Sequence, residues 1–389
     1  MILTSTATLP SDGDAGTLIG RVWRPDVDGP SVVAIRNGAV FDISASVPTT
    51  SALLNADDPV GLAQTAGDYL CGLGELLANT PDADHDPSRP HLLAPTDLQA
   101  IKAAGVTFAR SMLERVIEEQ AKGAPEKADA IRAQVQSQLG GDLNNLVPGS
   151  AEALALKETL IAQEAWSQYL EVGIGEDAEI FTKAQPMSAV GHGMRAGLHP
   201  RSTWNNPEPE VVLAVAASGK VVGATLGNDV NLRDFEGRSA LLLSKAKDNN
   251  ASAAIGPFIR LFDDTFSMDH VRHTTVTLTV KGTDRFELTG TSSMSEIARD
   301  PEALAAEMLG PTHQYPDGAV LYLGTMFAPT KDRDAPGMGF THKVGDIVTI
   351  AAPELGALTN EMTTADLAAP WTFGVGDLMH NLAQRGLLS

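Results

Sequence analysis

The sequence predicts an α+β protein: a mostly β domain with a helical insertion, preceded by a small β-rich N-terminal domain. Strand-like segments rich in Val, Ile and Thr follow one another from residue 179, separated by Gly, Asn and Asp turns. Residues 115–172 are instead rich in Ala, Glu, Gln and Leu, which indicates helices. Because strands and helices do not alternate regularly, the pattern disfavours a doubly wound parallel sheet.

The first 95 residues predict the small N-terminal domain. Apolar and polar residues alternate over 18–50, and Asn37-Gly38 is a typical two-residue hairpin turn between two β-like runs. A helical pattern follows at 59–78. Residues 80–97 are rich in Pro and Asp and form the best candidate linker. We therefore expect domains at 1–95 and 96–389.

The remaining chain predicts the larger domain and its insertion. Helical spacing appears in the second half of 98–122, and two more helices are expected near 125–139 and 151–171. One later helix is expected at 301–309. The predicted strands are 179–184, 210–217, 220–227, 274–282, 284–290, 319–327 and 346–352.

Composition excludes several classes of function. The net charge of −21 and the lack of any basic run argue against nucleic acid as a partner. The single cysteine, Cys71, cannot form an intrachain disulfide, which fits a cytoplasmic protein. The N-terminus has no signal-peptide pattern. No apolar run approaches the ~18 residues of a membrane span, so we expect no membrane contact.

Three carboxylates are the best candidate metal ligands. Glu208 and Glu210 lie in an extended segment shaped by Pro207 and Pro209, and period-two spacing points both to one face. Asp229 ends the next predicted strand. Three carboxylates without His or Cys favour a hard cation, Mg²⁺ or Mn²⁺, over zinc. On spacing alone, the solvated face of an edge strand is the more frequent explanation of such a pair.

Lys247 follows the apolar run that comes after these carboxylates. A surface lysine is the more frequent explanation of such a residue. Beside a metal in a dry cleft, however, its pKa could fall far enough for proton transfer.

Together these segments resemble the fumarylacetoacetate hydrolase family over most of residues 98–362. The family's carboxylate set falls on Glu208, Glu210 and Asp229, within PEPEVVL and GNDVNLRD. Other matched segments are the lysine next to the metal (Lys247), Phe181-Thr182-Lys183, Gly324-Thr325, Gly345-Asp346 and Gly356-Ala357-Leu358-Thr359-Asn360. The resemblance implies a metal-dependent enzyme with the family's catalytic domain, paired into a homodimer or homotetramer.

One departure from the family pattern narrows the expected activity. Family hydrolases and decarboxylases carry a His and a Glu that activate water; here Glu114 is kept but Ser111 replaces the histidine. Without an imidazole base, hydrolysis of a C–C bond is disfavoured. The sequence resembles the dehydratase branch, which acts on 2-keto-3-deoxy-D-xylonate (equivalently 2-dehydro-3-deoxy-D-arabinonate). The alternative is an acylpyruvate hydrolase or 2-keto acid decarboxylase.

The resemblance also implies roles for individual residues. Mg²⁺ would stabilise an enolate, and water loss would give 2-oxoglutarate semialdehyde (2,5-dioxopentanoate). Lys247 and Glu114 are the expected acid and base, with their order left open. The expected substrate-binding residues are Arg110, Ser111, Lys183 and Thr325. A protein of another class, in which the carboxylates hold a purely structural ion, remains an alternative.

Overall fold

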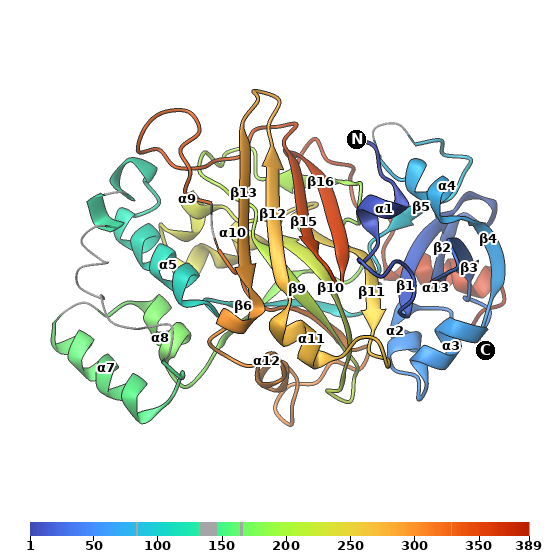
Figure 1. Ribbon diagram of the computed structural model, residues 1–389, viewed down its shortest axis with the longest axis horizontal. Helices are drawn as coiled ribbons and strands as arrows, with labels where there is room; N and C mark the ends of the chain where they lie inside the picture. The colour runs from blue at the N-terminus through green and yellow to red at the C-terminus, as the bar shows by residue number, and fades with distance from the viewer. Residues whose placement is uncertain (83–84, 129, 133–145, 164–165, 328, 389) are drawn as a thin grey trace.

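The computed structural model describes residues 1–82, 85–128, 130–132, 146–163, 166–327 and 329–388, with the side chain of Arg110 left out. Two β-sheets make up its centre, and helices lie at both ends (Figure 1). Mixed α+β architecture dominated by sheet confirms the fold class predicted from the sequence.

The larger sheet has eleven strands. Ten of them follow the order β4 (Asp68–Gly72), β3 (Ala39–Asp42), β2 (Gly29–Arg36), β1 (Leu18–Arg24), β11 (Ala253–Leu261), β10 (Val221–Asp229), β9 (Pro209–Val215), β14 (Ala319–Tyr322), β6 (Ala100–Gly105) and β7 (Glu179–Ala184), while β5 (His91–Leu93) pairs with β1. Strands of the N-terminal segment thus extend the sheet of the later residues, because Leu18 and Ile19 pair with Arg260 and Ile259.

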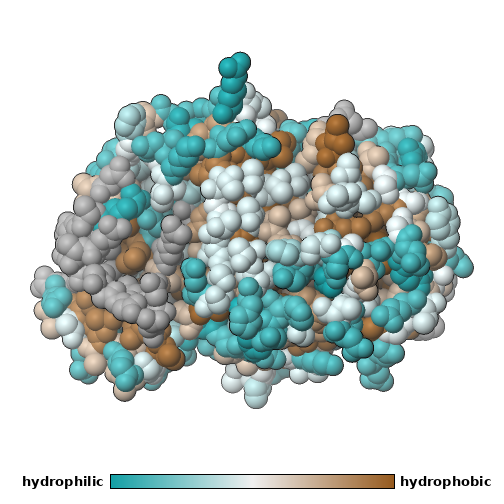
Figure 2. Space-filling view, in the orientation of Figure 1, coloured by the Kyte–Doolittle hydropathy of each residue, from teal (hydrophilic) through white to brown (hydrophobic). Residues whose placement is uncertain are grey.

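The smaller sheet has five strands: β13 (Glu287–Ser293), β12 (Thr275–Lys281), β15 (Ile347–Ala352), β16 (Gly356–Thr364) and β8 (Arg195–Leu198). In β12, Val276, Leu278 and Val280 are buried and alternate with more exposed threonines. The outward face of β12 and β13 is accordingly pale in the hydropathy colouring of Figure 2. The buried face packs on the larger sheet, since one apolar cluster contains Leu278 and Ile350 together with Val211 and Leu226.

Helices cover the ends of this two-layer core. Their bounds are α1 (Ser5–Thr8), α2 (Thr50–Leu54), α3 (Pro59–Thr65), α4 (Leu73–Ala78), α5 (Ala109–Ala121), α7 (Ala151–Ala162), α8 (Gln168–Ile174), α9 (Arg233–Glu236), α10 (Leu243–Lys247), α11 (Met268–His273), α12 (Pro301–Met308) and α13 (Val375–Gln384). Single 3₁₀ turns lie at Pro25–Val27, Pro125–Lys127, Ala240–Leu242 and Met294–Glu296. None of the helices in the described ranges is long and apolar enough to cross a membrane.

The helical insertion forms one end of the molecule, with α5, α7 and α8 at the left of Figure 1. Tyr169, Leu170 and Ile174 of α8 share an apolar cluster with Met112 and Val116 of α5. The helix expected over 151–171 is two helices, because Ser167 caps a new one by accepting a hydrogen bond from the Tyr169 N–H. The helix expected near 125–139 lies mostly outside the described residues.

One sequence expectation in the N-terminal segment is wrong. Residues 59–78 do not form a single helical stretch, because α3 ends at Thr65 and Asp68–Gly72 form the edge strand β4, which pairs with β3. Gly67 makes the break: its φ is 94°, and a side chain there would meet the Asp42 carbonyl oxygen at 2.3 Å. The boundary proposed at residue 95 stays a prediction.

Candidate metal centre

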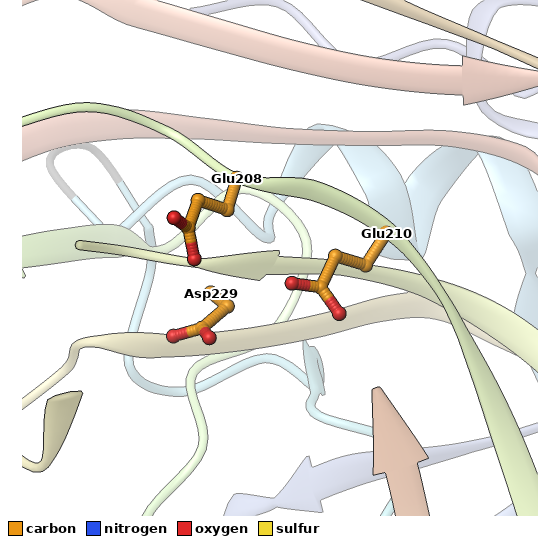
Figure 3. A group of neighbouring side chains, drawn as sticks. All are labelled: Glu208, Glu210 and Asp229. Carbon is orange, nitrogen blue, oxygen red and sulfur yellow. The ribbon is translucent and has the colours of Figure 1, made fainter. Parts of the chain in front are cut away.

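Strands β9 and β10 bring the three predicted ligand carboxylates together. Gly227 pairs with Glu210, and the Asp229 N–H donates to the Glu208 carbonyl (3.1 Å), so the start of β9 lies beside the end of β10. Figure 3 shows Glu208, Glu210 and Asp229 with their carboxylates turned toward one another. One oxygen from each lies within 4.8 Å of the others. All three side chains are buried, so they are not the solvated face of an edge strand.

Burial and mutual repulsion govern the protonation of this cluster. Burial, then Asp229 and Glu208, hold the pKa of Glu210 well above its ordinary value, although the Gly324 N–H donates to its Oε2 at 2.7 Å. Burial also raises the pKa of Glu208, against Arg115 and Lys247. For Asp229, burial is outweighed by Lys183 and Lys247, and the pKa is lowered. Without a cation, Glu210 is therefore the carboxylate that takes up a proton.

Lys247 joins the cluster from α10. Its Nζ lies 2.5 Å from Glu208 Oε2 and 2.9 Å from Asp229 Oδ2. Burial alone would lower the pKa of Lys247, but Asp229 and Glu208 outweigh it and raise that pKa above its ordinary value. The lowered pKa expected from a dry cleft is therefore not found, and Lys247 carries its proton.

Lys183 supports Asp229 from the other side. Its Nζ lies 2.7 Å from Asp229 Oδ1 and donates to the carbonyl oxygens of Lys247 (2.5 Å) and Val230 (3.1 Å). The side chain is completely buried. These contacts hold Lys183 beneath the carboxylates and not in the cavity beside them.

Helices α5 and α9 add a buried ionic network. Arg115 forms ion pairs with Glu118 (2.7 Å), Glu236 (3.2 Å) and Glu208. Arg233 in turn lies 3.1 Å from Glu118. Sequence reasoning missed this network; the only signal is the i, i+3 pair Arg115 and Glu118 beside the apolar face of α5.

A small cavity opens beside the carboxylates. Its lining includes the three carboxylates together with Lys247, Arg115, Glu236, Glu179, Phe181 and Thr325. Glu179 comes from the start of β7, opposite Gly105 of β6. A side chain at Gly105 would meet Glu179 Oε2 at 1.8 Å, so the glycine makes room for this carboxyl group. Burial first, then Glu236, raise the pKa of Glu179 to about 7.

The described residues around the cavity fit a divalent cation. They carry six carboxylates (Glu118, Glu179, Glu208, Glu210, Asp229 and Glu236) against four cations (Arg115, Lys183, Arg233 and Lys247). If every group were ionised, two negative charges would be left in a buried site, which a divalent ion would neutralise. The oxygen-only donor set suits a hard ion.

The other predicted site residues lie apart from the carboxylates. Arg132 binds both oxygens of Glu114 (3.0 and 2.9 Å), and Glu114 lines a different cavity with Phe327 and Lys331. Ser111 is buried and donates to the Phe108 carbonyl (2.9 Å). The side chain of Arg110 lies outside the described residues. Of the three predicted substrate-binding residues whose side chains are described, Thr325 alone lines the carboxylate cavity, and its Oγ1 donates to the Phe327 carbonyl (3.1 Å).

Comparison with known families agrees with this geometry. Residues 205–363, which include β9, β10 and the three carboxylates, match the family model described as fumarylacetoacetate (FAA) hydrolase C-terminal. The match covers less than half of the chain, and over that part these residues resemble a fumarylacetoacetate hydrolase C-terminal domain. The family resemblance found in the sequence is confirmed.

Two relatives of this chain have names that describe dehydratases. The 2-dehydro-3-deoxy-D-arabinonate dehydratase of Saccharolobus solfataricus is 31% identical over 183 residues, which cover 46% of this chain and 57% of that one. The chain thus spans little more than half the length of this relative. A protein of Haloferax volcanii named "Probable 2-keto-3-deoxyxylonate dehydratase" is 24% identical over 333 residues, 86% of this chain and 95% of that one.

A solved structure shares the fold of the whole molecule. It is described as 2-keto-3-deoxy-D-arabinonate dehydratase complexed with magnesium and 2,5-dioxopentanoate. The TM-score is 0.61 at 19% identity, with 89% of this chain and 99% of that chain covered. The likeness therefore extends well beyond the fumarylacetoacetate hydrolase C-terminal domain.

Proposed function

We propose that this protein is an Mg²⁺-dependent dehydratase that converts 2-keto-3-deoxy-D-xylonate (2-dehydro-3-deoxy-D-arabinonate) to 2-oxoglutarate semialdehyde (2,5-dioxopentanoate). One observation carries the proposal: three buried carboxylates and Lys247, all within the part that resembles a fumarylacetoacetate hydrolase C-terminal domain, line one cavity. The two relatives named as dehydratases of these sugar acids support the choice of substrate.

In this proposal Glu208, Glu210 and Asp229 hold the metal ion, which is Mg²⁺ or, as a substitute, Mn²⁺. Bound there, the ion supplies a Lewis acid that polarises the 2-keto oxygen and acidifies the proton on C3. Lys183 and Lys247 keep Asp229 ionised and fix its direction. The Gly324 N–H donates to Glu210 Oε2 and fixes the direction of that carboxyl group.

Dehydration also needs a base for the C3 proton and an acid for the departing C4 hydroxyl. Glu179 and Lys247 are the groups that we assign to these steps. With a pKa of about 7, the Glu179 carboxylate can accept a proton near neutral pH. Lys247 is protonated, and a cation held by Glu208 and Asp229 would offset the charges that raise its pKa, so that it could donate a proton. Glu114, the other candidate from the family resemblance, would have to leave Arg132 and pass around α5 to reach the substrate.

The cavity has a volume of only about 10 Å³, so it would have to widen to admit a sugar acid. Arg115 and Thr325 would then bind the substrate. Arg115 lines the cavity beside Glu208, and it would exchange one of its ion pairs for the carboxylate of a bound 2-keto acid. Thr325 offers a hydroxyl on the opposite loop. Arg110 and Ser111 remain candidates from the family resemblance, whereas the contacts of Lys183 suit a positioning role.

The decisive experiment removes two proposed metal ligands. The variant Glu208→Gln with Glu210→Gln keeps the side-chain volumes but loses two charges. We expect its dehydration of 2-keto-3-deoxy-D-xylonate to fall roughly a thousand-fold or more, because several kcal/mol of charge stabilisation would be lost. The measurement is the rate of 2,5-dioxopentanoate formation with saturating Mg²⁺. An undiminished rate would refute the metal assignment.

A hydrolase or decarboxylase on the same scaffold is tested in parallel. The wild-type protein is assayed with acylpyruvate and with oxaloacetate under the same conditions. Since Ser111 stands where the family's hydrolases carry histidine, we expect turnover of both to be far below that of the sugar acid. A preference for either compound would replace the dehydratase proposal.

A further inference from the structure

A second hollow lies on the outer side of α9 and α10, and its lining is basic. Arg201, Arg238 and Lys245 line it, together with Phe235 and Asp234. The chain as a whole has 28 Lys and Arg against 49 Asp and Glu. An ordinary surface hollow of such a protein would be expected to be acidic, so this concentration of positive charge needs an explanation.

The three cations converge on one aromatic ring. The guanidinium of Arg238 lies 4.7 Å from the centre of the Phe235 ring, that of Arg201 5.9 Å, and Lys245 Nζ 6.0 Å. The Phe235 side chain is buried, so packing holds the ring in place below the three cations. Contacts with the ring face are favourable for each cation but do not neutralise its charge.

No acid neutralises these cations within the described part of the chain, where none of the three forms an ion pair. Asp234, which shares the hollow, forms no ion pair with these cations and accepts hydrogen bonds from Ser202 Oγ and the Thr203 N–H, both at 2.8 Å. Its single negative charge leaves the hollow with an excess of positive charge. Three exposed cations close to one another repel, and a bound anion would remove that repulsion.

The positive charges of the hollow also affect the neighbouring His199. Its ring lies 5.1 Å from the Phe235 ring. Burial first, then Lys245 and Arg201, lower the pKa of His199. The imidazole therefore stays neutral near pH 7, and it leaves the three permanent cations as the positive charges of the hollow.

We propose that this hollow is a binding site for a small multivalent oxyanion, a phosphate ester or a polycarboxylate. Two guanidinium forks and one ammonium suit the oxygens of either group. The site is separate from the carboxylate cavity and does not depend on the proposed dehydratase activity. The two sites share α9 and α10: Phe235 and Lys245 line this hollow, whereas Glu236 and Lys247 line the carboxylate cavity.

The test is isothermal titration calorimetry at constant ionic strength with inorganic pyrophosphate and, separately, with citrate. Wild-type protein is compared with Arg238→Ala/Lys245→Ala. The matched control, Lys220→Ala/Lys281→Ala, removes two exposed cations elsewhere. We expect saturable binding to the wild type and the control, and binding at least ten-fold weaker to Arg238→Ala/Lys245→Ala. Binding of pyrophosphate alone, of citrate alone or of both would assign the site to phosphate, to carboxylate or to multivalent charge.

Two results would overturn the proposal. One is the absence of saturable binding of either anion to the wild type. The other is equal affinity of the wild type and of Arg238→Ala/Lys245→Ala for the anions. The first result includes the case in which the basic surface serves only for self-association, seen as a mass change by sedimentation without anion binding. Should the double variant fail to fold, Arg238→Gln replaces it, because this single exposed change leaves Phe235 and α10 intact.

Discussion

At the scale of single residues, Glu179 combines features that few surface carboxylates share. It lies at the start of β7, lines the same cavity as the three buried carboxylates, and has a pKa raised to about 7 by burial and by Glu236. A group that titrates near neutral pH can both accept and return a proton during turnover. The acidic side chains that would bind a cation therefore also help to raise the pKa of Glu179, so that Glu179 can act as a base near neutral pH.

Replacing Glu179 by Gln should lower kcat/KM by about 10²- to 10⁴-fold, because a positioned base would be lost. In the wild type, activity should rise with pH through about 7, since the base works when deprotonated. The measurement is a pH profile of kcat/KM for both proteins. Retention of the same profile in Glu179→Gln would exclude Glu179 as the base.

Glu179→Gln should lower activity but raise the stability of the fold above pH 7. Because the folded pKa of Glu179 lies above its ordinary value, the folded state binds more protons, and stability falls as pH rises from about 4.5 to 7. Glu179→Gln removes this loss, so its Tm should exceed that of the wild type at pH 8 but not at pH 4. Calorimetry at the two pH values measures both, and a lowered Tm at pH 8 would point to a structural role.

Some residues of the site could be predicted from the sequence and others could not. The set of Glu208, Glu210 and Asp229 could be found because period-two spacing and two prolines act locally. Glu179 and Arg115 could not, because each reaches the site through pairing or packing between segments far apart in the chain. For Arg115 the only local signal is Glu118 three residues later, which many exposed helix faces also show.

At the scale of elements, helix α5 separates two cavities. Successive residues on a helix point about 100° apart, so Glu114 faces the cavity of Phe327 and Lys331 while Arg115 faces the carboxylates. The helix itself could be predicted from its apolar spacing. Which of its polar side chains faces the site could not, because that depends on how the helix is turned against β9 and α9.

The pairing of β6 with β7 predicts the effect of a substitution at Gly105, which lies opposite Glu179. In Gly105→Ala, the added methyl carbon would lie only 1.8 Å from the present position of Glu179 Oε2. The flexible end of Glu179 can move away, so we expect the fold to survive while activity falls nearly as far as in Glu179→Gln. The measurements are kcat/KM and Tm.

Gly74→Ala is the matched control for this change. It lies in helix α4 with no atom within 4 Å of the added carbon. We expect unchanged activity and up to about 1 kcal/mol of added stability from the helix propensity of Ala. Full activity in Gly105→Ala would mean that the position of Glu179 is not needed for turnover.

At the scale of the whole molecule, the charge left over in the site links metal binding to stability. Removing divalent ions with EDTA should lower Tm by several degrees, and Mg²⁺ should restore it, since an ion bound at 100 Kd adds about 2.7 kcal/mol. Differential scanning calorimetry measures the shift. Glu208→Gln/Glu210→Gln should show none, and an equal shift in that variant would place the ion elsewhere.

Strand content and the mostly β character could be predicted because alternation is a local signal. The way in which the N-terminal strands join the larger sheet could not, since Leu18 pairs with Arg260 and no short-range pattern encodes that contact. Further contacts reinforce the junction: the Leu261 N–H donates to the Thr17 carbonyl (2.9 Å), and Arg260 lies 2.6 Å from Asp12.

This junction has an evolutionary consequence. A chain that lost its first two dozen residues would leave residues 259–261 of β11 without their partner strand, with free backbone groups able to pair with another molecule. The N-terminal segment therefore acts as a shield against aggregation as well as a part of the fold. Recombination that swaps this segment between related proteins can succeed only where the new segment brings a strand able to cover that edge.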